Sequence, residues 1–377
     1  MNGHTPVVIG IDGGGTHSFA VAVDSAGRTL ATAMAGSLNF LSAGWPTARR
    51  NLKTLVGALE QRLPPRLQPG KIVVGCAALF SDATNAEKGK LCRGILPLRR
   101  TRVVSDCQTA CFGATLGRPG VAVIAGTGSI VLAVNETGQL TRVGGWGHLL
   151  GDAGSAYWIA VESVKAAIAA EEGLGPSTAL GPVIGRWFDT KRLAGIVSFI
   201  YGPRFRKETF AGLAGYLARK VGRRDAVFRR ICQQAGQELA AQARAAVKLA
   251  RLRSRPLSVC LVGSVLTNNA LVRDSLVAAL KRTGAARFAK PVLSPSQAAA
   301  AMALGDAGVE LTDDVVGNLA KSDLGTNLNH PRASDKAGKS ARSHARCALP
   351  SDECLREILR GRVRTVGEGV RDTTRGD

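Results

Sequence analysis

The stretch Gly10-Ile-Asp-Gly-Gly-Gly-Thr16 directly follows the apolar run Val7-Val8-Ile9. This pattern predicts a buried strand that ends in a tight glycine turn, with an acid before the last glycines and a hydroxyl after them. Glycines lack the Cβ atoms that would keep a phosphate away from the backbone N–H groups. Asp12 can hold a magnesium ion, and Thr16 can donate to a phosphate oxygen. The turn is therefore predicted to bind phosphate, and an ordinary glycine-rich hairpin is the alternative.

The residues after this turn read as a strand (18–24), a short turn (25–28) and another strand (29–33). The glycine loop thus joins two hairpin strands, whereas a Walker loop or a Rossmann fingerprint would open a helix. A second unit has the same order: an apolar strand (121–125), the turn Gly126-Thr-Gly-Ser129, and a strand (130–134). Two such units predict a duplicated α/β lobe with one nucleotide between the copies.

These loops resemble those of the sugar kinase, Hsp70 and actin superfamily. Within it they are similar to the N-acetylglucosamine kinase and BadF/BadG/BcrA/BcrD ATPase family. Residues 144–160 (Gly-Gly-Trp-Gly-His-Leu-Leu-Gly-Asp-Ala-Gly-Ser-Ala-Tyr-Trp-Ile-Ala) resemble the family signature G-G-W-G-x-x-x-G-D-E-G-S-A, with Ala153 in the usual Glu position. The resemblance covers residues 6 to 308. It implies an α/β fold of two duplicated ribonuclease H-like lobes, the actin-like ATPase fold, with the nucleotide cleft between them.

The function that this resemblance implies is an ATP-dependent kinase. It would use ATP and Mg²⁺ to phosphorylate a hydroxyl of an amino sugar, N-acetylglucosamine or glucosamine. Phosphoryl transfer requires an in-line hydroxyl, a metal-bridged phosphate and a base near that hydroxyl. Asp106 ends the predicted strand 101–106, where the resembling kinases carry their catalytic aspartate, and would accept the proton of the sugar hydroxyl. The alternative is that Asp106 caps the helix behind it.

The resemblance also assigns the other site residues, position by position. Asp12 is the expected metal ligand. The expected sugar-binding residues are Asn39, Thr127, Gly128, Gly145, Trp146 and Asp152. The expected nucleotide-binding residues are Gly13, Gly14, Gly15, Thr16, Gly126, Ser129, Gly212, Gly263 and Ser264. Core packing is the alternative role of Trp146, and helix packing is that of Gly212. Ala78 and Ala153 depart from the family pattern on the sugar side, so they leave the identity of the sugar open.

Two other functions remain open. The first is an ATPase activator subunit of a dehydratase or reductase, which holds an iron–sulfur cluster through cysteines in a glycine-rich loop. The eight cysteines of this chain are scattered without a CxxC pair, and no such loop is visible. The second is a non-catalytic, sugar-binding regulator that kept the fold. The set of Asp12, Thr16, Asp106 and Asp152 argues against a loss of catalysis.

Composition restricts the partners. The formal net charge is +22, but the basic residues are dispersed and no aromatic residues alternate with them, so nucleic acid is not an expected partner. Anionic substrates such as ATP account for the charge more simply. No apolar run approaches the length of a membrane span, and no signal-peptide pattern is present. Scattered cysteines without a CxxC pair make a reducing cytoplasm the default compartment. Relatives are often dimers, which leaves a homodimer open.

Three regions are predicted along the chain. Residues 1–115 form an N-terminal ATPase lobe. Residues 116–310 form a C-terminal ATPase lobe, and its last helix, from Gln297, packs back across the lobes as in the family. Residues 311–377 are rich in Ser, Gly, Asn, Lys and Arg, and are predicted to be a mostly disordered tail. A regulatory or partner-binding tail is the alternative.

Overall fold

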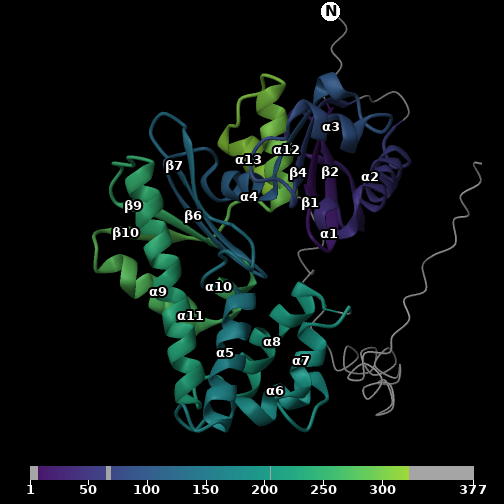
Figure 1. The fold of residues 1–377 in the computed structure, drawn as a ribbon. Coiled ribbons are helices and arrows are strands. Elements are labelled where there is room, and N and C mark those ends of the chain that lie inside the picture. Colours follow the sequence, from purple (N-terminus) through teal and green to yellow (C-terminus); the bar gives the residue numbers. More distant parts are fainter. Residues whose placement is uncertain (1–6, 65–68, 204, 322–377) are drawn as a thin grey trace, which may run out of the picture. The chain divides into compact units, whose positions relative to one another are not determined.

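The computed structural model describes residues 7–64, 69–203 and 205–321. Two five-stranded sheets organise these residues (Figure 1). The first sheet contains β1 (Val7–Gly13), β2 (His17–Val23), β3 (Thr29–Gly36), β4 (Pro69–Cys76) and β5 (Thr101–Ser105). The second contains β6 (Gly120–Ala125), β7 (Ser129–Val134), β8 (Leu140–Gly144), β9 (Leu257–Val262) and β10 (Ala286–Ala289).

The two sheets have the same topology. Their strand orders are β3-β2-β1-β4-β5 and β8-β7-β6-β9-β10. In each, three consecutive strands pair antiparallel, and two later strands add in parallel on the other side of the first strand. The predicted duplicated α/β fold is therefore confirmed. The glycine turns join β1 to β2 and β6 to β7, as the sequence predicts.

Helices cover the first sheet, and in the longest of them the apolar residues recur at helical spacing. These elements are α1 (Phe40–Ala43), α2 (Trp45–Glu60), α3 (Asn85–Cys92), the 3₁₀ turn η1 (Leu98–Arg100) and α4 (Asp106–Thr115). Leu52, Leu55 and Leu59 of α2 are fully buried, in agreement with the periodicity of the sequence. They belong to a core that also contains Ile9 and Val74 from the sheet.

The segments between β8 and β9 and around β10 supply the helices of the second core. They are α5 (Ala156–Glu171), α6 (Leu180–Phe188), α7 (Gly195–Ile200), α8 (Lys207–Lys220), α9 (Ala226–Leu249), α10 (Ser264–Asn268) and α11 (Ala270–Lys281). Asp225 caps α9 by accepting a hydrogen bond of 2.8 Å from the Phe228 N–H. No helix among the described residues is long and apolar enough to cross a membrane.

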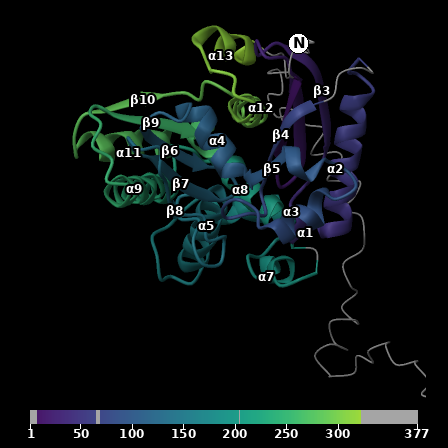
Figure 2. The same ribbon diagram turned by 90° about the horizontal axis from the view of Figure 1, so that it is seen from above.

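Helix α12 (Pro295–Asp306) connects the last part of the chain to the first sheet. It contacts β1, β4 and α4, beside which it lies in Figures 1 and 2. Its run of alanines lets the backbones approach closely. A Cβ atom added at Gly10 of β1 would collide with the backbone of Ala300, so only glycine fits there. Helix α4 contacts strands of both sheets, so the predicted lobe boundary at 115/116 falls directly behind an element shared by the two cores.

The start of the predicted tail differs from the expectation. Residues Asp313–Ala320 form helix α13, which Thr312 caps. The Asn318 side chain donates a hydrogen bond of 2.9 Å to the carbonyl oxygen of Ala26, in the turn between β2 and β3. Leu319 is fully buried. Composition missed this helix because its few apolar residues gain their stability from a contact with the first 30 residues of the chain. The remainder of the predicted tail, 322–377, lies outside the described residues.

Candidate active site

The first glycine loop is held by backbone hydrogen bonds. The Gly14 N–H donates to the carbonyl oxygen of His17 (3.1 Å), and the Gly14 carbonyl oxygen accepts from the Leu38 N–H (3.3 Å). A Cβ atom at Gly13 would lie 2.6 Å from the carbonyl oxygen of Gly75, whereas a Cβ atom at Gly15 would meet no atom within 4 Å. Gly15 and Thr16 are exposed. The loop therefore presents an open backbone surface, as phosphate binding requires.

Asp12 and Asp106 lie at the carboxyl ends of β1 and β5, the two parallel strands on either side of β4. Asp12 pairs in register with Gly75 of β4, and a Cβ atom at Gly75 would lie 3.4 Å from the Asp106 Cα. Asp106 directly follows β5 and is the first residue of α4. The cap of that helix is Ser105, whose Oγ accepts from the Gln108 N–H at 3.3 Å. The capping role considered for Asp106 is therefore wrong, because its neighbour performs it.

Both carboxyl groups have raised pKa values. Burial, with the nearby Asp106 charge adding to it, raises the pKa of Asp12 from 3.8 to about 7. Burial also raises the pKa of Asp106, while a 3.2 Å hydrogen bond from the Cys107 thiol and the positive charge of Lys207 act in the opposite direction. Two desolvated acids that repel each other form a site that favours a divalent cation. Mg²⁺ typically takes one or two carboxylates and completes its shell with phosphate oxygens and water, and this donor set fits it.

The second glycine loop rests on the start of α5. The carbonyl oxygens of Gly126 and Thr127 accept hydrogen bonds from the N–H groups of Ala156 (2.9 Å) and Tyr157 (3.3 Å). The Ser129 hydroxyl donates to the carbonyl oxygen of Ala153 at 2.8 Å. Ala153 thus contacts the loop through its backbone carbonyl oxygen. A glutamate at this position would supply the same oxygen, so the contact does not depend on the side chain.

Four of the expected sugar residues gather around this loop. A Cβ atom at Gly128 would lie 2.6 Å from the Asp152 Oδ2, so glycine is needed for this contact. Asp152 is buried and has a left-handed backbone (φ 58°). The Gly145 N–H donates to the carbonyl oxygen of Ser129 (3.1 Å), which brings the signature segment against the loop. Thr127 is the fourth of these residues and precedes Gly128 in the same turn.

Trp146 is not a core residue, since 58% of its surface is exposed. Its ring lies 6.4 Å from that of Phe80, in the loop that follows β4, and the Arg142 guanidinium carbon lies 4.9 Å from the Trp146 ring. Core packing is therefore excluded for Trp146.

Asn39 lies near the first glycine loop, because Ser37 and Leu38 both donate hydrogen bonds to the Gly14 carbonyl oxygen. It also caps α1, with its Oδ1 accepting from the N–H groups of Leu41 (3.1 Å) and Ser42 (3.2 Å). The Asn39 Nδ2 takes no part in this helix cap.

The expected adenosine residues separate into two groups. Gly263 has a φ of 97° and lies against the backbone of Ala125, and a Cβ atom at Gly126 would lie 4.0 Å from the Ser264 Oγ. Gly263 and Ser264 therefore adjoin the second glycine loop. Gly212 is exposed on α8, and a Cβ atom there would meet, within 4 Å, only the ring of Trp187. Its contacts thus agree with the alternative, helix packing.

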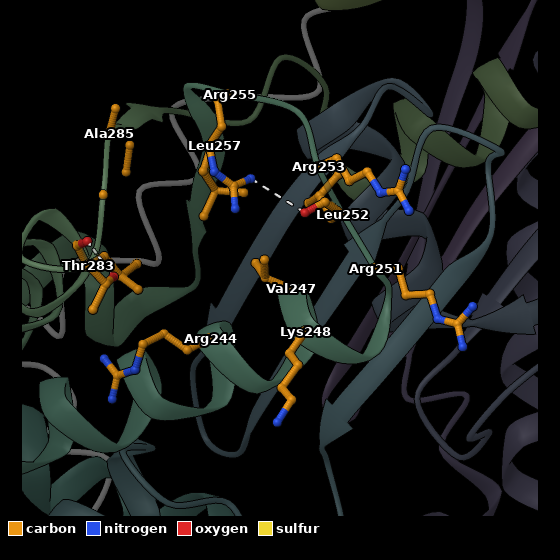
Figure 3. Close-up of a pocket in the computed structure, with 13 residues that line it drawn as sticks. Arg244, Val247, Lys248, Arg251, Leu252, Arg253, Arg255, Leu257, Thr283 and Ala285 are labelled. Carbon is orange, nitrogen blue, oxygen red and sulfur yellow. Dashed lines mark hydrogen bonds between the residues drawn. The ribbon is translucent and has the colours of Figure 1, made fainter.

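A cavity of about 460 Å³ lies elsewhere, at the end of α9 and beside β9 and β10. Five cationic side chains line it, those of Arg244, Lys248, Arg251, Arg253 and Arg255. Figure 3 shows Arg244, Lys248 and Arg251 extending in different directions, and Arg255 bonded back to the carbonyl oxygen of Leu252. Because these cations do not converge, and because no expected site residue lines the cavity, it is a solvated basic surface.

Several residues of this site were not predicted from the sequence. Cys107 follows Asp106 in the chain, so its adjacency was visible but its hydrogen bond was not. Lys207 affects the pKa values of both Asp106 and His148, although it lies far from them in sequence. Phe80 and Arg142 gave no local signal, because their contact joins the loop after β4 to β8.

Comparisons with known proteins agree with this arrangement. The chain is 30% identical over 267 residues to an N-acetylmuramic acid/N-acetylglucosamine kinase of Clostridium acetobutylicum, covering 69% of this chain and 86% of the relative. It is also 30% identical over 222 residues to the N-acetyl-D-glucosamine kinase of Dictyostelium discoideum, covering 55% and 69%.

A solved structure from Chromobacterium violaceum, provisionally named an N-acetylglucosamine kinase, superimposes with a TM-score of 0.64 and 26% identity. The match covers 80% of this chain and 99% of that one. The model of the BadF/BadG/BcrA/BcrD ATPase family matches residues 9–307. With two duplicated sheets, two glycine loops and a family match over most of its length, the chain belongs to the BadF/BadG/BcrA/BcrD ATPase family.

Proposed function

We propose that this protein is an ATP-dependent kinase that phosphorylates a hydroxyl of an amino sugar, N-acetylglucosamine or glucosamine. The observation that carries the proposal is the meeting of Asp12 and Asp106 beside an open glycine loop. One carboxylate is available to bind a metal ion and the other to accept a proton, and phosphoryl transfer requires both of these roles in addition to an in-line hydroxyl. The names of the relatives support the choice of sugar.

Asp106 is the proposed base. Its raised pKa brings its proton affinity closer to that of a general base at neutral pH. The Cys107 thiol, which donates to its Oδ1, fixes the orientation of the carboxylate. Asp152, buried against Gly128, accepts hydrogen bonds from sugar hydroxyls, and Gly145 and Trp146 line the same side.

The glycine loops at residues 13–16 and 126–129 hold the triphosphate through backbone N–H groups other than those of Gly14 and Gly126, which bond within their own loops. Gly263 and Ser264 adjoin the nucleotide. Mg²⁺, held by Asp12, would neutralise phosphate charge. Gly212 is exposed on α8, and its role is limited to contact with the adenine ring of ATP.

The test compares Asp106→Asn with Ser105→Ala. Asp106→Asn removes the proton acceptor and leaves the Ser105 cap intact, so turnover should fall by roughly two to four orders of magnitude without a loss of stability. Ser105→Ala removes the cap and should cost about 1 kcal/mol of stability while retaining most of the turnover. Near-normal turnover by a folded Asp106→Asn variant would eliminate Asp106 as the base.

An ADP-release screen across N-acetylglucosamine, glucosamine and plain hexoses tests the substrate class. ADP release that depends on an amino sugar supports the kinase. Release that is independent of every sugar would instead favour an activator-type ATPase. Binding of sugar without any turnover would indicate a regulator.

We also propose that the protein acts in the cytoplasm and forms a homodimer. The six described cysteines, at positions 76, 92, 107, 111, 232 and 260, are unpaired, as a reducing compartment favours. Sedimentation analysis of the full chain tests the dimer.

A further inference from the structure

Phe80 lies in the loop between β4 and α3 and exposes 57% of its surface. This loop is anchored at both ends to parts of the candidate site. At its start, the Ala77 N–H donates to the carbonyl oxygen of Gly13 at 2.9 Å. Near its end, Asp82 accepts a hydrogen bond of 3.0 Å from Gln108, on the helix that begins with the proposed base. The two anchors hold the loop next to the first glycine loop and next to that helix.

The ring of Phe80 lies beside that of Trp146, an expected sugar residue. The ring centres are 6.4 Å apart, and the ring planes are tilted by 38°. The Arg142 guanidinium carbon lies over both rings, 5.0 Å from the centre of Phe80 and 4.9 Å from that of Trp146. These three distances form a triangle, so the guanidinium covers one face of each ring while the rings lie side by side. Because both rings are more than half exposed, their opposite faces are free.

Arg142 supports these rings and is not itself placed to bind a ligand. Its Nη1 is shielded from solvent and has no hydrogen-bond partner among the described residues. None of the ion pairs that these residues form includes Arg142. Its printed contacts are those with the two aromatic faces, which attract a guanidinium and restrain the orientation of both partners.

Two free aromatic faces suit the chemistry of a pyranose sugar. A gluco-configured ring carries its hydroxyls around the rim, so its C–H bonds form an apolar face. The negative face of an aromatic ring attracts these C–H hydrogens, and packing the two faces together removes apolar surface from water. Aromatic side chains beside a few placed polar groups are typical of small-molecule sites.

We propose that Phe80 is a sugar-binding residue and that Arg142 positions it. The free face of Phe80 packs against the C–H face of the amino sugar, next to Trp146, while Arg142 holds both rings from the other side. The sugar thereby contacts segments that follow strands of both sheets, β4 and β8. This inference rests on the proposed kinase function.

The test measures kcat and the KM values for sugar and for ATP, with N-acetylglucosamine or glucosamine, whichever turns over faster. The variants are Phe80→Ala, Phe80→Tyr and the control Leu174→Ala, which alters a side chain that is 80% exposed in the turn after α5. Loss of the aromatic face in Phe80→Ala should raise KM for the sugar roughly tenfold and leave kcat and KM for ATP within about twofold. Phe80→Tyr keeps the ring and should restore KM for the sugar. The control should match the unmodified protein.

Arg142→Met removes the cation and keeps a long apolar side chain. It should raise KM for the sugar by roughly three- to tenfold, again with little change in KM for ATP. Because Arg142 acts in part through Phe80, the double variant Phe80→Ala/Arg142→Met should lose less than the product of the two single losses. Losses that multiply would overturn the positioning role.

An unchanged KM for the sugar in Phe80→Ala would overturn the inference, while sugar-dependent turnover would leave the kinase function standing. Equal rises of KM for sugar and for ATP, or a fall in kcat alone, would show a structural role and overturn the inference as well. The same holds if Phe80→Tyr does not restore KM for the sugar. Circular dichroism checks that each variant is folded, which the exposure of Phe80 leads us to expect. If the unmodified protein shows no sugar-dependent turnover, the proposed function and this inference fail together.

Discussion

Replacing Asp12 by asparagine should stabilise the metal-free protein, because Asp12 is desolvated and lies near a second acid. Its pKa of about 7 exceeds the ordinary 3.8. A shift of about three units costs about 4 kcal/mol once the carboxyl group is ionised in the folded state, as at pH 8. Since the folded-state pKa is the higher one, the folded protein binds more protons between the two values. The stability of the unmodified protein therefore falls as pH rises from about 4 to about 7.

The magnitude depends on pH in a way that thermal melts can measure. At pH 5 the folded carboxyl group is protonated, and the penalty is only about 1.6 kcal/mol, which reflects ionisation in the unfolded state. With an unfolding entropy of about 2.1 cal/mol/K per residue and a folded body of about 300 residues, Asp12→Asn should raise Tm by about 6 °C at pH 8 and by 2 to 3 °C at pH 5.

Glu60→Gln, which alters an exposed carboxylate, is the matched control and should change Tm by less than about 1 °C at either pH. Adding Mg²⁺ and ATP should stabilise the unmodified protein more than the variant, because only the former keeps the proposed metal ligand. An equal shift of Tm at both pH values, or a lower Tm of the variant at pH 8, would refute the desolvation argument.

Further predictions follow from the packing of single glycines and of the last helix. Gly15→Ala, with no atom near the added Cβ, should leave Tm unchanged but weaken ATP binding at least tenfold in calorimetry, whereas an unchanged affinity would remove this loop from the phosphate site. Gly128→Val should displace Asp152 and reduce sugar turnover in the ADP-release assay; full activity would contradict the contact. Gly10→Ala should prevent or severely weaken folding, because its Cβ would enter the backbone of α12; a normal melt would disprove this packing. A chain that ends at residue 321 should melt like the full chain, whereas one that ends at 310 should lose roughly 3 to 5 kcal/mol with the buried face of α13; equal melts would show that α13 adds nothing.

Much of the architecture was predictable because its signals are local. The glycine turns after apolar runs identified both β-turn-β units. Ser155 and Asp225, which cap α5 and α9, are of the residue types that favour a helix start. Strand β9, Leu257–Val262, coincides with a mostly apolar run of the sequence. Each of these features depends on neighbouring residues, through strand alternation, turn conformation or a side-chain cap.

Other features required the tertiary structure. The cap of α4 is Ser105, although Asp106 beside it is an equally good capping residue by type. Helix α13 is too short and too polar to be recognised without the turn at Ala26 on which it packs. The raised pKa of Asp12 depends on the solvent excluded by its neighbours and on Asp106, which lies 94 positions further along the chain.

By itself, then, the sequence determined that the chain contains two copies of a glycine-turn sheet and the residues of an ATPase family. Only the tertiary structure decided which of these residues meet: Asp12 with Asp106, Gly128 with Asp152, and Arg142 with Phe80. The reason is physical. Turns, caps and strand periodicity depend on a few consecutive residues, whereas charge interactions, desolvation and aromatic contacts depend on distances between segments that the folded chain brings together.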